Sequence, residues 1–352
     1  MSTQGSEQNT YLPPVIFGTS GLGNLYTILP QKEKCAIIKA FVDNSAKPAV
    51  FDSAGKYGAG LALESLAQSL KELNIDPGDV LISNKLGWLR TELKTPEPTF
   101  EPGVWKGLQF DAIQQISYNG ILECYEQGNT LLGHYPAKLV SVHDPDEYLN
   151  AATDDTDRNK RYQDILDAYK ALAELKQQGK VKSVGVGAKD WKIIERISTD
   201  VKLDWVMIAN SMTVHSHPTA LLAFMKKLQQ QGIGIINSAV FNGGFLTGGD
   251  YYNYHLIDAE SPEGKELYQW RESFYALCNK HQLEPAAVCV QFGLAAPGVG
   301  SIAMNTSNPN RVAHNSGMID TEILPEFWTE LFEEKLITQQ GLEMVQSKYS
   351  SN

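Results

Sequence analysis

Four side chains that could transfer a proton stand at or just after predicted strands, far apart in the sequence. Asp52 ends an apolar run, and Tyr57 follows it within a glycine-rich turn. Lys85 lies close to the end of another apolar run, and His143 lies at the end of a third. Residues at the carboxyl ends of different strands meet at one mouth when the strands close into a parallel barrel. The four side chains would then form one site.

A carboxylate, a phenol, an ammonium and an imidazole together suit proton transfer to or from an oxygen bonded to carbon. A free tyrosine has a pKa of about 10, so we expect the ammonium of Lys85 to lower the pKa of Tyr57 by favouring the phenolate. Asp52 would compensate the buried cation, and His143 would orient the reacting oxygen. Because none of these groups carries electrons, an oxidation at this site requires a cofactor that accepts hydride.

The elements that must position these residues alternate along the chain. Apolar runs bounded by small residues predict strands, and apolar residues at helical spacing predict the segments between them. The predicted strands are 15 onward, 49–52, 80–87, 138–144, 183–188, 205–210, 233–240 and 300–305. The predicted helices are 31–45, 61–73, 111–128, 158–178, 191–198, 219–231, one from about residue 310, and a final amphipathic helix over 322–345.

Eight strand and helix repeats without an obvious linker predict an α/β protein, a single (β/α)8 TIM barrel with an additional C-terminal helix. We expect one barrel domain over residues 15–352, preceded by a flexible N-terminal segment, residues 1–14. The polar stretch 150–159 is interpreted as a surface loop, and 95–103 as a lid or a substrate loop. The glycines at 185 and 187 lack the last glycine of a dinucleotide fingerprint, which favours a turn of the barrel.

Composition limits the partners. The net charge is -11 and the isoelectric point about 5.2, which disfavours binding to nucleic acid or to anionic lipid and favours a small-molecule substrate. Four widely separated cysteines form no C-x-x-C pair and indicate a reducing compartment. The first residues lack a basic start and an apolar core, and no run reaches membrane-spanning length, so we expect a cytoplasmic protein. The oligomeric state stays open.

Several motifs in order resemble the aldo-keto reductases, and within them the L-fucose or D-threo-aldose 1-dehydrogenase group, with L-galactose and pyridoxal dehydrogenases as relatives. The resemblance extends over nearly the whole chain, and the order and spacing of its motifs make it specific. The motifs that carry it are residues 17–26, 51–58, 84–87, 142–146 and 169–181.

The resemblance implies that Tyr57 is the general acid or base, that Lys85 tunes it, that Asp52 pairs with Lys85, and that His143 orients the substrate oxygen. It also implies a nicotinamide cofactor, NAD or NADP, across the mouth of the barrel. The implied cofactor-binding residues are Thr19, Ser20, Asp52, Lys189, Asn210, Ser238, Val240, Asn242, Asn305, Arg311 and Asn315. The substrate-site candidates are Tyr26 and Trp88.

The sequence departs from this family at the amides that hold the nicotinamide carboxamide. Lys189 stands where relatives place an amide after the fifth strand, and Asn210 where a glutamine is common after the sixth. Asn305 occupies the position of a cation that many relatives use on a 2'-phosphate, although Arg311 remains available. The choice between NAD and NADP therefore stays open.

Four functions are compatible with these residues. The first is oxidation of the anomeric hydroxyl of a free aldose to its lactone, and the second is NADPH-dependent reduction of an aldehyde or ketone. A third is a metal-dependent hydrolase that uses His143, His215 and His217, although no recurring ligand set supports it and we expect no metal. The fourth is a non-catalytic barrel that binds nicotinamide as a sensor or partner subunit. Taken alone, Asp52 and Lys85 are also compatible with a structural ion pair.

Overall fold

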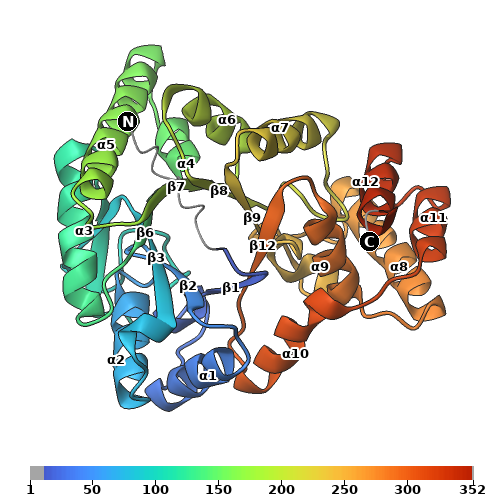
Figure 1. Ribbon diagram of the computed structural model, residues 1–352, viewed down its shortest axis with the longest axis horizontal. Coiled ribbons are helices and arrows are strands. Elements are labelled where there is room, and N and C mark those ends of the chain that lie inside the picture. Colours follow the sequence, from blue (N-terminus) through green and yellow to red (C-terminus); the bar gives the residue numbers. More distant parts are fainter. Residues whose placement is uncertain (1–11, 351–352) are drawn as a thin grey trace, which may run out of the picture.

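The computed structural model describes residues 12–350, and its centre is a closed barrel of parallel strands (Figure 1). The strand order is β1-β12-β9-β8-β7-β6-β3-β2, so the first and last strands of the barrel pair and close it. This confirms the predicted barrel. Its strands are β1 (Val15–Gly18), β2 (Ala49–Ala54), β3 (Val80–Leu86), β6 (Leu139–His143), β7 (Ser183–Ala188), β8 (Trp205–Ala209), β9 (Gly234–Ser238) and β12 (Val299–Met304).

Helices surround the barrel, and a group of additional helices packs outside it around α9 on one side (Figure 1). The surrounding helices are α1 (Gln31–Asp43), α2 (Leu61–Glu72), α3 (Tyr118–Leu132), α5 (Asp155–Gln177), α6 (Trp191–Asp200), α7 (Thr219–Gln230), α9 (Pro285–Ala295) and α10 (Val312–Gly317). The additional ones are α8 (Pro262–Lys280), α11 (Pro325–Glu333) and α12 (Gln339–Ser350). A short helix, α4 (Pro145–Asn150), lies apart from this group and packs against α5 and β7. None of the described helices is both long and apolar enough to span a bilayer.

A separate apolar cluster fills the interior of the barrel near the amino ends of its strands. Trp205 is fully buried at its centre and packs with Leu81 and Ile236. A Cβ on Gly185 would lie 2.2 Å from Cδ2 of Trp205, so the strand needs glycine there to leave room for the indole. The glycines at 185 and 187 therefore lie within strand β7 and not in a turn, and Gly185 serves packing.

An antiparallel hairpin outside the barrel corrects one sequence prediction. The strands β4 (Trp88–Glu92) and β5 (Phe110–Gln114) pair with each other, with Trp88 opposite Gln114. The predicted helix over 111–128 is therefore wrong in its first residues, and α3 begins at Tyr118, where the Ser117 hydroxyl accepts a hydrogen bond from Gly120 N. The segment between the two strands, residues 93–109, is called the hairpin segment below.

The C-terminal region holds two helices where one was expected. The chain adopts a left-handed conformation at Lys335, with φ of +60°, and this separates α11 from α12. The predicted surface loop 150–159 is also partly helical, because α5 already begins at Asp155. Of the predicted flexible segment 1–14, residues 1–11 lie outside the described part of the chain. The carbonyl of Pro13 accepts a hydrogen bond of 2.5 Å from the Ser301 hydroxyl.

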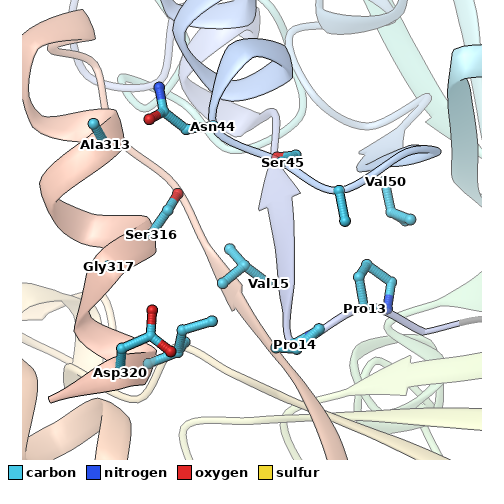
Figure 2. Close-up of a pocket in the computed structure, with 12 residues that line it drawn as sticks. Pro13, Pro14, Val15, Asn44, Ser45, Val50, Ala313, Ser316, Gly317 and Asp320 are labelled. Atoms are coloured by element: carbon cyan, nitrogen blue, oxygen red, sulfur yellow. The ribbon is translucent and has the colours of Figure 1, made fainter.

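A recess lies at the amino end of β1, away from the strand ends that carry the predicted site (Figure 2). Its volume is about 320 Å³, and its walls come from the start of β1, the end of α1 and the C-terminal part of α10 with the turn after it. The lining includes Pro14, Asn44, Ser316 and Asp320. None of the predicted site residues lines this recess.

Candidate active site

The carboxyl ends of β2, β3 and β6 bring three of the four predicted catalytic residues together in the interior. Asp52, Lys85 and His143 are all buried. Lys85 forms an ion pair with Asp52, and the Ser83 hydroxyl donates a hydrogen bond of 3.1 Å to the other oxygen of the same carboxylate. The Asp52 carboxylate is therefore held by two residues of the neighbouring strand.

Tyr57 lies beside this ion pair, in the turn after β2. The ammonium of Lys85 is 4.7 Å from the centroid of the Tyr57 ring, and the ring meets that of His143 edge-on at 5.5 Å. The turn reaches this place because glycines let two loops touch: a Cβ on Gly23 would lie 2.8 Å from the Tyr57 carbonyl carbon, and Gly58 has a φ of +62°. The structure thus brings all four predicted residues together.

The environment sets the protonation of these groups. Burial raises the pKa of Tyr57 and outweighs the ammonium of Lys85, which lowers it. The Lys85 ammonium thus lowers the pKa of Tyr57 as expected, but burial has the larger effect and the pKa lies above its usual value. Burial opposes the Lys85 cation, yet Asp52 and Tyr57 together hold the pKa of Lys85 above its usual value. Burial, together with the Lys85 cation, holds the pKa of His143 well below its usual range, so its imidazole is neutral at neutral pH.

The predicted cofactor residues of the first and last barrel strands lie close together. The Thr19 hydroxyl donates a hydrogen bond of 3.1 Å to the carbonyl of Asp52. Asn305 Nδ2 donates a hydrogen bond of 2.8 Å to the Ser20 hydroxyl. The first contact ties the loop after β1 to β2, and the second ties it to the loop after β12, on the same edge of the barrel as the predicted catalytic residues.

Two buried asparagines after β8 and β9 keep side-chain oxygens without a protein donor. Asn210 has a φ of +61° and Asn242 a φ of +48°, and Asn242 Nδ2 donates to the Asn210 carbonyl at 3.3 Å. Within the described residues, Oδ1 of each has no hydrogen-bond partner. Such buried acceptors fit a ligand that carries N–H or O–H groups, as a nicotinamide dinucleotide does.

The remaining predicted cofactor residues have more ordinary surroundings. The Ser238 hydroxyl donates to the carbonyl of Ile208 at 3.3 Å, and Val240 is buried against the cluster that contains Ile302. Lys189 forms an ion pair of 2.5 Å with Glu147. Arg311 is exposed at the end of η4 (Pro309–Arg311), and Asn315 is partly exposed in α10.

Of the two substrate candidates, Tyr26 lies in the loop after β1 and Trp88 is the first residue of β4. Tyr26 is 45% exposed, and its ring stacks on that of Tyr251 at 5.7 Å. Trp88 begins the β4 and β5 hairpin and packs on Phe100 at 5.7 Å. The indole Nε1 of Trp88 is buried and has no partner among the described residues.

The structure also reveals charged residues that sequence reasoning did not assign. Lys56 directly precedes Tyr57 and is buried, with Glu101, Asp144 and Glu147 around its ammonium. The only sequence signal was a lysine inside the glycine-rich turn, where most positions are small. Its partners could not be found from spacing, because they come from two distant segments.

The histidines of the predicted hydrolase site have separate structural partners. His215 Nδ1 contacts the Tyr252 hydroxyl at 2.8 Å, and His217 Nε2 accepts a hydrogen bond of 3.0 Å from Thr338 N. In the part of the chain that the structure describes, no three His, Cys, Asp or Glu side chains are grouped so that they could hold a metal ion. The geometry does not favour the hydrolase alternative.

A parallel barrel with this phenol, ammonium, carboxylate and imidazole at its mouth suits proton transfer to or from an oxygen on carbon. The profile of the Aldo/keto reductase family matches residues 14–334. The chain therefore belongs to the aldo/keto reductase family, as the sequence motifs predicted.

Characterised relatives are similar to this chain over most of its length. Pyridoxal 4-dehydrogenase of Microbacterium luteolum is 27% identical, with 91% of this chain and 93% of the relative covered. D-threo-aldose 1-dehydrogenase of a Pseudomonas species is 26% identical, with 93% and 95% covered. L-galactose dehydrogenase of Arabidopsis thaliana is 20% identical, with 85% and 82% covered.

Solved structures share the fold at lower sequence identity. A glycerol dehydrogenase from Gluconobacter oxydans superimposes with a TM-score of 0.67 at 16% identity, with 91% of this chain and 90% of that chain covered. An aldo-keto reductase from Bacillus halodurans, described as a holo form, has a TM-score of 0.63 at 16% identity, with 95% and 91% covered. The (β/α)8 barrel is therefore shared by all three.

Proposed function

We propose that this enzyme oxidises the anomeric hydroxyl of a free aldose, of the L-fucose, L-galactose or D-arabinose type, to its lactone. The observation that carries the proposal is the placement of the Lys85 ammonium and the His143 ring against the Tyr57 ring, 4.7 Å and 5.5 Å from its centroid. The names of the relatives add support, since two of the three are sugar dehydrogenases. NAD or NADP supplies the acceptor for the hydride when it is bound.

The residues of the chain account for the proton. Tyr57, as phenolate, accepts the proton of the anomeric hydroxyl while the hydrogen on the same carbon leaves with its electron pair as hydride. The carbon–oxygen bond thereby becomes a carbonyl. Lys85 stabilises the phenolate, and the Asp52 carboxylate balances the charge of Lys85. The neutral His143 donates a hydrogen bond to the reacting oxygen and fixes its position.

We propose that the cofactor is held by the strand-end residues predicted above. Asn210 and Asn242 support this assignment, because their buried oxygens have no donor among the described residues. Thr19 and Ser20 line the same edge of the barrel. Arg311 is exposed close to Asn315 and supplies a cation for a phosphate, so both NAD and NADP belong in the assay.

A second candidate is reduction of an aldehyde or ketone by the same residues. One observation favours it: burial raises the pKa of Tyr57, which keeps the phenol protonated at neutral pH and ready to act as an acid. Because the oxidation releases one proton, the direction of the overall reaction depends on pH and on the ratio of oxidised to reduced cofactor. The free thiols of all four cysteines support the expected reducing, cytoplasmic compartment.

The test is an assay of cofactor reduction, followed at about 340 nm, the absorbance of a reduced nicotinamide. L-fucose, L-galactose, D-arabinose and pyridoxal are each offered with NAD and with NADP, and aldehydes are offered with NADPH. Turnover of at least one aldose supports the proposal. Turnover of aldehydes alone selects the reductase. Tight binding of NADPH without turnover of any compound would identify a non-catalytic binding protein.

A further inference from the structure

A buried lysine at the mouth gathers three carboxylates. The ammonium of Lys56 lies 2.9 Å from Glu101 Oε1, 3.2 Å from Asp144 Oδ2 and 2.8 Å from Glu147 Oε2. Three acceptors satisfy all three protons of the ammonium. We call Lys56, Glu101, Asp144 and Glu147 the Lys56 cluster. It lies next to the proposed catalytic centre, because Lys56 directly precedes Tyr57.

Asp144 has an unusual conformation within this cluster. Its φ of +46° and ψ of 54° are left-handed, and it stands at the N-cap position of α4 without a side-chain capping hydrogen bond. An aspartate at this position normally accepts a hydrogen bond from the first turn of the helix. Here the carboxylate is aimed at Lys56 instead, and Oδ2 lies 3.6 Å from His143 Nε2. Strain of this kind persists where the surrounding structure enforces it, which is common at functional sites.

The cluster also fastens the hairpin segment over the catalytic tyrosine. Glu101 bonds Lys56 through Oε1 and accepts a hydrogen bond of 2.7 Å from Trp105 Nε1 through Oε2. The Trp105 ring packs on the Tyr57 ring at 5.8 Å. A β-bridge between Leu25 and Trp105 ties the same segment to the loop after β1. Lys56 therefore links the hairpin segment, through Glu101, to Asp144 and Glu147 after β6.

The charges of the Lys56 cluster favour a neutral substrate that carries hydroxyl groups. Lys189 pairs with Glu147, so two cations face the three carboxylates of the cluster and one negative charge remains. Carboxylates accept strong hydrogen bonds from hydroxyl groups. The same excess charge repels a substrate that carries a carboxylate or a phosphate.

We propose that Asp144 determines specificity by accepting a hydrogen bond from a hydroxyl beside the reacting carbon of a neutral polyhydroxy substrate, and that Lys56 is the positioning residue that holds Asp144. The inference rests on the proposed function and adds a substrate class to it. The side chain of Asp144 is 11% exposed, which leaves a ligand atom access to the carboxylate. Asp144 Oδ2 lies 3.6 Å from His143 Nε2. When His143 binds the reacting oxygen of the substrate, the carboxylate of Asp144 therefore lies within reach of a hydroxyl on the neighbouring carbon.

Asp144→Gly tests the specificity role, because glycine tolerates the left-handed backbone and removes only the carboxylate. We expect kcat/KM for L-fucose to fall about 10- to 100-fold, the value of a hydrogen bond to a charged group. For butanal, which has no hydroxyl, kcat/KM should change less than about threefold, since it cannot make that hydrogen bond. Asp43→Asn, an exposed carboxylate on α1, is the control and should change neither value.

Equal losses with L-fucose and butanal would overturn the specificity role and leave the proposed function intact. An unchanged kcat/KM for L-fucose would overturn it as well. A wild-type protein that turns over neither compound would instead contradict the proposed function.

Lys56→Met and Lys56→Arg test the positioning role without relying on turnover. We expect Lys56→Met to increase the rate of amide hydrogen exchange in the hairpin segment at least tenfold, and Lys56→Arg to restore most of the protection. In kinetics, Lys56→Met should raise KM for L-fucose much more than it lowers kcat. Unchanged exchange in Lys56→Met, or a loss confined to kcat, would overturn the positioning role.

Discussion

The ammonium of Lys85 lies 4.7 Å from the centroid of the Tyr57 ring and is itself paired with a buried carboxylate. The phenol is thus subject to two opposed effects, a cation that favours the phenolate and a buried environment that favours the neutral form. In the mechanism that we propose, this balance lets Tyr57 take up a proton in one direction of the reaction and release it in the other.

Removal of the Tyr57 hydroxyl should stop proton transfer while the rest of the mouth remains in place. We expect Tyr57→Phe to lower kcat by a factor of about 10³ or more and to leave the Kd for NADPH within about threefold, because the ring contacts do not change. Steady-state kinetics and fluorescence titration measure the two values. Tyr118→Phe, which removes a hydroxyl bonded to Glu174 on the surface, is the matched control. Normal turnover by Tyr57→Phe would contradict the mechanism.

The two directions of the reaction should respond to pH in opposite ways. In the proposed mechanism oxidation needs the Tyr57 phenolate, and the pKa of Tyr57 is raised, so kcat/KM for an aldose should rise steadily from neutral pH to beyond pH 9. Reduction needs the phenol, so kcat/KM for an aldehyde should stay level over the same range and fall only above it. Because the pKa of His143 is lowered, no loss from its protonation should appear down to pH 6. Profiles of kcat/KM against pH in both directions check this, and a falling oxidation limb would contradict it.

The buried ion pair should be costly to break from one side. We expect Lys85→Met to lower the free energy of unfolding by about 3–5 kcal/mol, because it leaves the Asp52 carboxylate buried without its cation. The double variant Lys85→Met with Asp52→Asn should recover most of that loss, since no unpaired charge remains. Urea denaturation measures both. An additive loss in the double variant would show that the two residues do not interact.

Gly185 should tolerate no side chain. Gly185→Ala places a methyl group 2.2 Å from Trp205, and we expect a loss of about 1–3 kcal/mol in the free energy of unfolding from overpacking. Gly300→Ala, in β12 with no atom within 4 Å of the added carbon, should be nearly neutral. Trp205→Phe should recover part of the loss in Gly185→Ala. Denaturant titration of the variants checks all three.

The sequence was most informative where a strand ends in a polar residue. Asp52, Lys85 and His143 each follow an apolar run, and a parallel barrel brings such ends together, so their convergence was predictable. The β4 and β5 hairpin was not, because Phe110–Gln114 is held by its pairing with Trp88–Glu92 and not by a local pattern. The pKa of Tyr57 also needed coordinates, since the extent of burial decides its direction.

The contacts of the Lys56 cluster could not be predicted from the sequence. Lys56 had no partner that spacing could suggest, because Glu101 lies in the hairpin segment and Asp144 after β6. The left-handed backbone of Asp144 could not be predicted from the sequence either, since aspartate is a usual residue at the start of a helix.

The break between α11 and α12 at Lys335 was also not predictable from the residue type, because a lysine ordinarily favours a helix.

The pairing of β1 with β12 has a consequence for biosynthesis. During translation Val15–Gly18 leaves the ribosome long before Val299–Met304, so one edge of the nascent sheet stays open until nearly the whole chain has emerged. The Ser20 and Asn305 side chains can meet only after that event. A chain that stops before residue 299 lacks β12, so it leaves the edges of β1 and β9 unpaired and open to aggregation.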